Sequence, residues 1–257
     1  MFADFTPLYP LLFPFLMVLF RVLGLFVFVP VFSNAAIPGN IKVLLSLAIT
    51  FCVWNTVPHT TASPETLIGL VIAIIGEMSV GLMIGMLVAG VFAGVQLGGH
   101  LVSQQMGLSM ANIYDPSFED QSTVIEQVGF WIALVAFLYM GGHREILNAI
   151  VYSYRTVPMG NGGMSPDMML AAVCGSLDTA MHAAMRVAMP ALVAFFIATL
   201  TAGLMSRAMP QMNMMTIGVH INLIVGFFMV MAGMVGWAMV SKASFQSMFD
   251  LLGKLLG

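Results

Sequence analysis

The sequence has 257 residues, of which 60% are hydrophobic and only 7% are charged. An ordinary soluble domain carries about 25% charged residues, so much of this chain must face lipid or other protein subunits. The net charge of −3 and the absence of a basic run argue against nucleic acid as a partner. No linker or low-complexity tract divides the chain, so we predict a single domain over residues 1–257.

Six apolar runs follow in chain order, and each is helical by length and by its richness in Leu, Met, Ala and Phe. They cover residues 8–32, 41–57, 67–101, 128–142, 168–205 and 214–240. The fold class is therefore all-α, with about six long hydrophobic helices in membrane-associated hairpins, several of them kinked or longer than a bilayer span. Residues 241–257 are expected to form a short amphipathic tail.

Two of these runs are longer than a bilayer requires, and charges interrupt them. Residues 67–101 would extend about 52 Å as a straight helix and residues 168–205 about 57 Å, against a hydrocarbon core of about 30 Å. Glu77, Asp178 and Arg186 lie inside these runs, and Arg21 lies inside the first run. Because a charge facing lipid is costly, we expect all four side chains to face protein or water, with part of the apolar surface packed on neighbouring subunits.

The glycines of the third run include a regularly spaced series: Gly81, Gly85, Gly90, Gly94 and Gly98. Three pairs among them have the GxxxG spacing that lets another helix approach backbone to backbone. We interpret them as a close helix-packing surface rather than a hinge. Either interpretation predicts a crowded assembly.

A polar stripe follows at the end of the same run, where Gln96, His100 and Gln104 recur every four residues. It fits the wall of a water-filled passage and equally a hydrogen-bonded seam between helices, and the sequence does not separate the two. One histidine with two amides offers too few good ligands for a metal site.

A second stripe lies in the fifth run, where Asp178, His182 and Arg186 share one helix face. An Asp/His pair suits a proton relay. The interpretation we favour is a self-paired stripe that neutralises buried charge at an interface.

Enzyme signatures are missing from the sequence. It contains no HExxH, GxSxG, P-loop or GxGxxG motif followed by an acidic residue, and its carboxylates form no evident pair with a base. We predict no catalytic residue, no cofactor and no metal.

Six short segments point together to one family. They are RVLG (21–24), AIPGNIK (36–42), QMGLSMANIYDP (105–116), FLYMGGH (137–143), VPMG (157–160) and SRAMPQMN (206–213). In this order, and over most of the chain, they resemble the family of the flagellar biosynthetic protein FliR and the related SctT export-gate subunits of injectisomes.

The resemblance implies a subunit of the flagellar type III export gate, in the bacterial inner membrane at the flagellar basal body. It implies assembly with FliP and FliQ, contact with membrane lipid, and FlhB and FlhA nearby. Part of this assembly would lie above the membrane plane, and unfolded flagellar proteins would pass through its centre.

The resemblance further implies that the loop after the glycine-rich helix plugs the closed pore. The residues that would form or delimit this plug are Met106, Gly107, Leu108, Met110, Ile113, Tyr114 and Pro116. The alternative function is a small ion-coupled secondary transporter that uses Asp178 and His182, although the inverted repeats expected of such a carrier are not visible.

Overall fold

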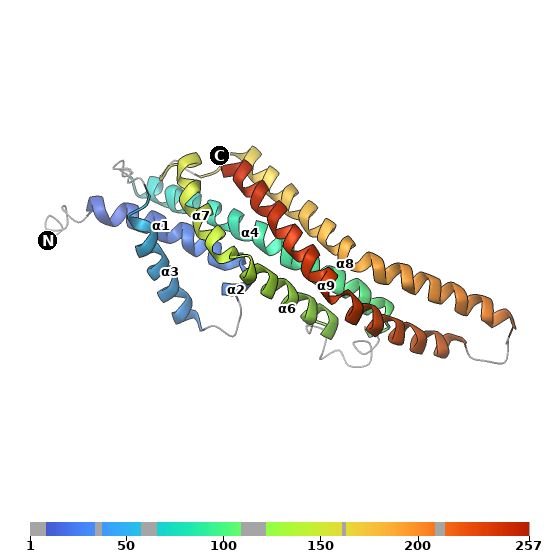
Figure 1. Ribbon diagram of the computed structural model, residues 1–257. Coiled ribbons are helices and arrows are strands. Elements are labelled where there is room, and N and C mark those ends of the chain that lie inside the picture. The colour runs from blue at the N-terminus through green and yellow to red at the C-terminus, as the bar shows by residue number, and fades with distance from the viewer. Residues whose placement is uncertain are drawn as a thin grey trace. The chain divides into compact units, whose positions relative to one another are not determined.

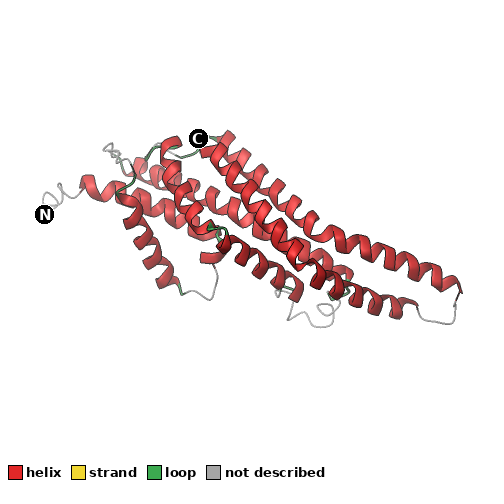
Figure 2. Ribbon diagram, in the orientation of Figure 1, coloured by secondary structure: helices red, strands yellow, loops and turns green. Residues whose placement is uncertain are grey.

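The computed structural model describes residues 9–33, 38–57, 66–108, 122–160, 163–208 and 214–256. In these ranges all regular secondary structure is helical (Figures 1 and 2), which confirms the all-α prediction. The helices are α1 (Tyr9–Phe28), α2 (Pro30–Ser33), α3 (Gly39–Trp54), α4 (Leu67–Gln105), α6 (Val124–Tyr139), α7 (Gly142–Thr156), α8 (Pro166–Ala208) and α9 (Met214–Leu256).

Fewer helices qualify as membrane spans than the six apolar runs suggest. Among the described residues, α4, α8 and α9 are each long and apolar enough to cross a membrane, and α6 with α7 adds a fourth if that broken pair is one span. The first run divides into α1 and α2, and α3 is a shorter apolar helix. In α1, apolar residues such as Met17 and Val22 are wholly buried within the chain, so their hydrophobicity reflects packing rather than contact with lipid.

The chain separates into two compact units. One lies within Met1–Gly90, Gly141–Asp178 and Gln246–Gly257, and the other within Val91–Met140 and Thr179–Phe245. Because α4, α8 and α9 each contribute to both units, the expected single domain stays a prediction. The tail expected after Val240 is the last part of α9, which continues without a break to Leu256.

In the first unit, α1 and α4 pack at very short range. Every fourth residue of α1 turns inward, so that Phe13, Met17, Arg21 and Leu25 are all buried. A Cβ atom on Gly81 would collide with the backbone of Arg21, and one on Gly85 would lie 2.8 Å from the carbonyl oxygen of Leu25. Gly81 and Gly85 of α4 are therefore the contact surface for α1.

Three further glycines of α4, Gly90, Gly94 and Gly98, face α8. In the first unit, a Cβ on Gly90 would lie 3.0 Å from the carbonyl oxygen of Ser176. In the second unit, a Cβ on Gly94 would lie 2.8 Å from the Cα of Ala180, and one on Gly98 would lie 2.7 Å from the side chain of Val187. The close packing that the GxxxG spacing predicts is present, but the partner helices belong to this chain.

A cluster of aromatic rings forms much of the second unit's interior. The centroid of Phe92 lies 5.8 Å from that of Phe137 and 5.2 Å from that of Phe245. The rings of Phe137 and Phe245 are 5.2 Å apart. Tilted and edge-on ring pairs at these distances are favourable, and they fasten α6 and α9 to α4.

The glycine contacts give a matched pair of substitutions. Gly94→Ala places a methyl group against the α8 backbone and should destabilise the chain by about 1–3 kcal/mol. Gly203→Ala, where a Cβ meets nothing within 4 Å, should be neutral or stabilise by up to about 1 kcal/mol. The thermal midpoints of the purified variants in detergent provide the comparison. Equal midpoints would contradict close packing at Gly94.

Candidate functional site

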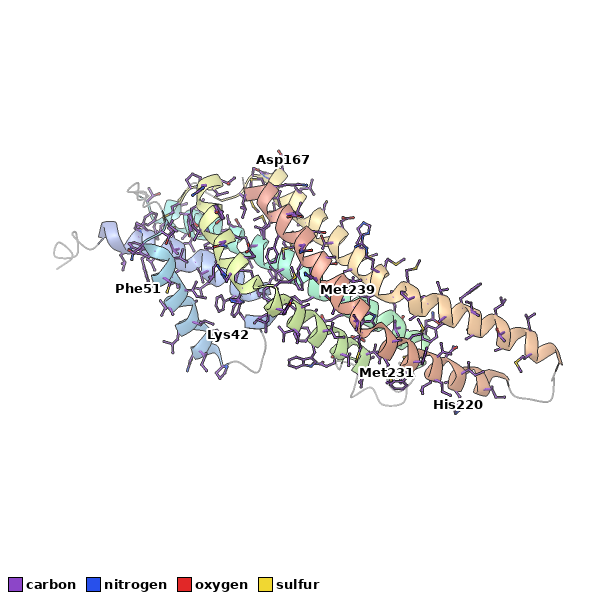
Figure 3. The ribbon with its side chains drawn as sticks, viewed as in Figure 1. Lys42, Phe51, Asp167, His220, Met231 and Met239 are labelled. Carbon is purple, nitrogen blue, oxygen red and sulfur yellow. The ribbon has the colours of Figure 1, made fainter. Side chains whose placement is uncertain are left out.

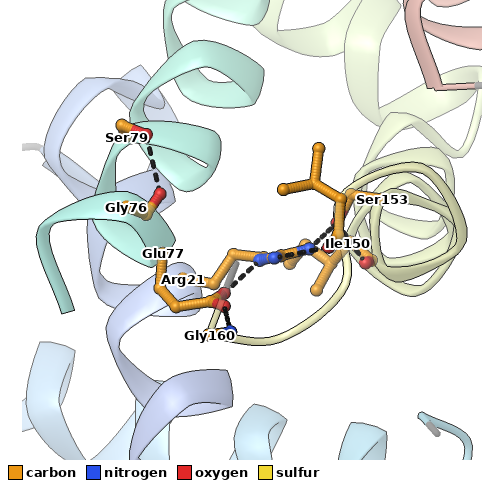
Figure 4. Close-up of polar contacts among 8 residues, drawn as sticks. Arg21, Gly76, Glu77, Ser79, Ile150, Ser153 and Gly160 are labelled. Atoms are coloured by element: carbon orange, nitrogen blue, oxygen red, sulfur yellow. Dashed lines mark hydrogen bonds and ion pairs between the residues drawn. The ribbon is translucent and has the colours of Figure 1, made fainter. Parts of the chain in front are cut away.

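A charge cluster is centred on Arg21 of α1, whose side chain is fully buried; Figure 4 shows its polar contacts. Its Nε donates to Oε2 of Glu77 in α4 at 2.7 Å. One terminal nitrogen donates to the Ser153 hydroxyl of α7 at 2.7 Å, and the other donates to the Val157 carbonyl at 3.0 Å. Each of the three guanidinium nitrogens thus donates one hydrogen bond to an acceptor.

The partners of Arg21 are themselves held in place. Oε1 of Glu77 accepts a hydrogen bond of 3.1 Å from the backbone N–H of Gly160, which has a φ of +75° that favours glycine. The Tyr154 ring lies 3.6 Å from the guanidinium carbon, measured to the ring centroid, as a cation–π contact. The Tyr154 hydroxyl is buried and has no hydrogen-bond partner within the described ranges.

This cluster joins segments that are far apart in the sequence: α1, α4, α7 and the residues that follow α7. Arg21 and Glu77 both face protein, as their place inside apolar runs predicts. Their pairing with each other was not predicted. Two of the family-like segments, RVLG and VPMG, meet at this point, since they supply Arg21, the Val157 carbonyl and the Gly160 amide.

A hydrogen-bonded seam joins the end of α4 to the start of α6. His100 Nδ1 lies 2.7 Å from Oε1 of Glu126, and His100 Nε2 lies 2.8 Å from the amide nitrogen of Gln104. Thr123 and Glu126 form a reciprocal capping box at the start of α6. His100 and Gln104, two members of the predicted stripe, are therefore hydrogen-bonded to each other. Glu126 is the partner of His100 on α6, and the four-residue spacing within α4 could not identify it.

The other interpretation of this stripe, as the wall of a passage, stays a prediction. Gln96 is half-buried, and Gln104 is exposed. An exposed amide next to a histidine leaves polar groups available to water at this end of α4.

The expected plug loop begins with a well-defined helix end. The Leu108 N–H donates to the Ser103 carbonyl at 3.2 Å, and the Gly107 N–H donates to the Gln104 carbonyl at 3.0 Å. Together with a φ of +80° at Gly107, this is a Schellman motif, which stops α4 at a fixed place.

The structure places the predicted plug residues in different environments. Met106 is wholly buried, and a Cβ on Gly226 of α9 would collide with its side chain, so Met106 is an interior residue rather than a member of an exposed seal. Leu108 is half-buried. Met110, Ile113, Tyr114 and Pro116 lie outside the described residues.

The stripe of Asp178, His182 and Arg186 is exposed on α8 in this chain. The expectation that these charges are buried is therefore not met within the chain. Four-residue spacing establishes that they share a face, but it does not establish what covers that face.

The same long helices carry a large exposed apolar surface. Met231 and Met239 project from α9 (Figure 3) and are 73% and 67% exposed, and Phe228 is 70% exposed. Phe196 of α8 is 69% exposed. Apolar surface on this scale indicates contact with lipid or with other proteins. Among the described residues, no group of three or more His, Cys, Asp or Glu side chains is placed to bind a metal ion.

Comparison with known proteins assigns most of the chain to one group. Residues 12–248 match the family model described as bacterial export proteins, family 1. The chain is similar to the flagellar biosynthetic protein FliR of Escherichia coli (strain K12), with 28% identity over 239 residues, covering 93% of this chain and 90% of the relative. It is similar to FliR of Bacillus subtilis (strain 168), with 26% identity over 250 residues and 95% of each chain covered. FliR of Caulobacter vibrioides is 26% identical over 232 residues, covering 90% of this chain and 92% of the relative.

Removing one partner of the Arg21–Glu77 pair should destabilise the fold much more than removing both. Arg21→Met leaves the Glu77 carboxylate buried without its counter-charge, which should cost about 3–5 kcal/mol. The double change Arg21→Met with Glu77→Leu should recover a large part of this loss, because no buried charge remains. Thermal unfolding of the purified variants measures both effects. A single variant as stable as the wild type would contradict the dependence of the fold on this pair.

Proposed function

Because the chain belongs to the bacterial export proteins, family 1, we propose that it is a subunit of the flagellar type III export gate. In this proposal it assembles with FliP and FliQ in the bacterial inner membrane at the flagellar basal body, with FlhB and FlhA nearby. The assembly forms the channel through which unfolded flagellar proteins leave the cell. The role is structural and conductive, without catalysis. The relatives that are named FliR align with nearly the whole chain.

The observation that supports assembly most strongly is the exposed apolar surface of α8 and α9. Each helix has 43 residues, or about 65 Å if straight, against about 30 Å of hydrocarbon core. One bilayer crossing therefore cannot cover all of the exposed apolar side chains. The remainder needs neighbouring protein, as in a multi-subunit gate part of which lies above the membrane plane.

We further propose that residues 107–116 form the plug of the closed channel. The support is the geometry of the two flanking helices. Gly107 ends α4 by a fixed turn, and the capping box at Thr123 starts α6. The bond between His100 and Glu126 holds these two ends together. The segment between them therefore leaves and returns at one place, which suits a loop that projects into a pore and seals it with apolar side chains.

One co-expression experiment tests both parts of the proposal. The tagged wild-type chain, expressed with FliP and FliQ, should carry both partners through purification. A variant that lacks residues 108–114 should assemble equally well, because Met106 and the cap at Gly107 remain, but it should leak. Ion conductance of the reconstituted complex should rise well above the wild-type value, and cell growth should slow.

A matched variant separates loss of length from loss of apolar side chains. Replacing residues 108–114 with Gly and Ser residues of equal number keeps the loop length and should also leak. A wild-type chain that purifies alone, as a stable homo-oligomer that transports ions, would contradict the gate and favour the carrier. A deletion variant that assembles, stays tight and exports normally would contradict the plug alone.

A further inference from the structure

A groove lies beside Pro190 of α8 in the second unit. It has a volume of about 380 Å³ and is lined by Arg186 and Pro190 from α8 and by Met229, Gly233, Gly236 and Trp237 from α9, among other residues. Arg186 is the one charged side chain among the residues that line this groove. An otherwise apolar surface thus presents a single guanidinium group.

The floor of the groove lets another backbone come close. A Cβ on Gly236 would meet nothing within 4 Å, and a Cβ on Gly233 would meet only the Trp237 ring, at 3.6 Å or more. These two glycines differ from those of α4, whose space is already taken by helices of this chain. Open glycines on an apolar helix leave room for a further helix to pack at short range.

The charge of Arg186 needs a partner from outside the groove. Its neighbours along the exposed face, Met185 and Met189, are 45% and 48% exposed and cannot compensate a cation. The acidic residue on the same face is Asp178, eight residues earlier, which is about 12 Å along the helix axis. A guanidinium group on such an apolar surface is costly unless an anion lies against it.

With the bilayer centred on α8, the position of Arg186 favours a protein anion over a lipid headgroup. The helix begins at Pro166 and ends at Ala208, which are 20 and 22 residues from Arg186. Arg186 is therefore about 30 Å from each end. A hydrocarbon core of about 30 Å that is centred on Arg186 would keep the headgroups about 15 Å away on either side. The carboxylate of an apolar helix can reach this depth.

We propose that this groove binds an apolar helix of a neighbouring subunit, which packs on Gly233 and Gly236 and places an Asp or Glu carboxylate against Arg186. The inference rests on the proposed function, because it requires an assembly with other subunits. A guanidinium–carboxylate pair in such a site fixes the register of two helices as well as holding them together, because its paired hydrogen bonds have one geometry.

Charge reversal tests the proposal in the co-expressed complex with FliP and FliQ. Arg186→Glu should abolish co-purification of at least one partner, whereas Arg186→Lys should retain part of it. Arg144→Glu, which reverses an exposed charge on α7, is the matched control and should leave assembly intact. Because Arg186 is exposed in this chain, the yield and the elution profile of the Arg186→Glu chain expressed alone should match those of the wild type.

A suppressor selection then identifies the partner residue. Cells that carry Arg186→Glu should regain swimming through an Asp or Glu to Lys or Arg change within an apolar helix of another subunit. Rescue by Asp178→Lys in the same chain would overturn the inference in favour of a self-paired stripe. An intact complex that has lost only bound anionic phospholipid would overturn it in favour of a headgroup. Failure of the wild-type chain to co-purify contradicts the proposed function, whereas normal co-purification of Arg186→Glu contradicts this inference alone.

Discussion

The buried ion pair of Arg21 and Glu77 is the constraint on which the first unit depends. Two charges enclosed in an apolar interior are costly unless they are paired and hydrogen-bonded, and α1, α4, α7 and the Val157–Gly160 segment together supply the partners of both. Glycines at the α1–α4 contact let the two helices approach closely enough for the side chains to meet, so the packing and the charge pairing require each other. An all-apolar core would allow more ways of packing the same helices.

The surface of the molecule contrasts with this buried ion pair, because α8 and α9 expose many apolar side chains. The glycines of α4 and the aromatic cluster fix the interior, while α8 and α9 direct Phe, Met and Leu side chains outward along most of their length. Methionine is flexible and fills irregular gaps, which suits surfaces that pack against several different neighbours. A rigid inner framework with an apolar outer surface suits the proposed role as a subunit of a larger assembly.

The sequence predicts the helices and the inward direction of Arg21 and Glu77, because hydrophobic periodicity and the cost of a lone charge are local properties. The pairing of these two residues joins positions 56 residues apart in the sequence, and periodicity has no information at that range. For the same reason the GxxxG spacing predicts close packing without revealing that α1 and α8 of this chain are the partners. Met106 is apolar, as a plug residue should be, but its contact with Gly226 of α9 depends on the tertiary fold, which local sequence does not reveal. The exposure of Asp178, His182 and Arg186 likewise follows from which faces α8 buries, which spacing alone does not determine.

Site-specific photo-crosslinking in living cells tests the central claim most directly, namely that protein covers the exposed surface of α9. A photoreactive residue at Phe228 or Met231, both strongly exposed, is compared with one at Val230, which is buried within the chain. The account predicts adducts with other export-gate subunits from Phe228 and Met231 and none from Val230. Adducts with lipid alone at both exposed positions, in cells that assemble flagella normally, would contradict it.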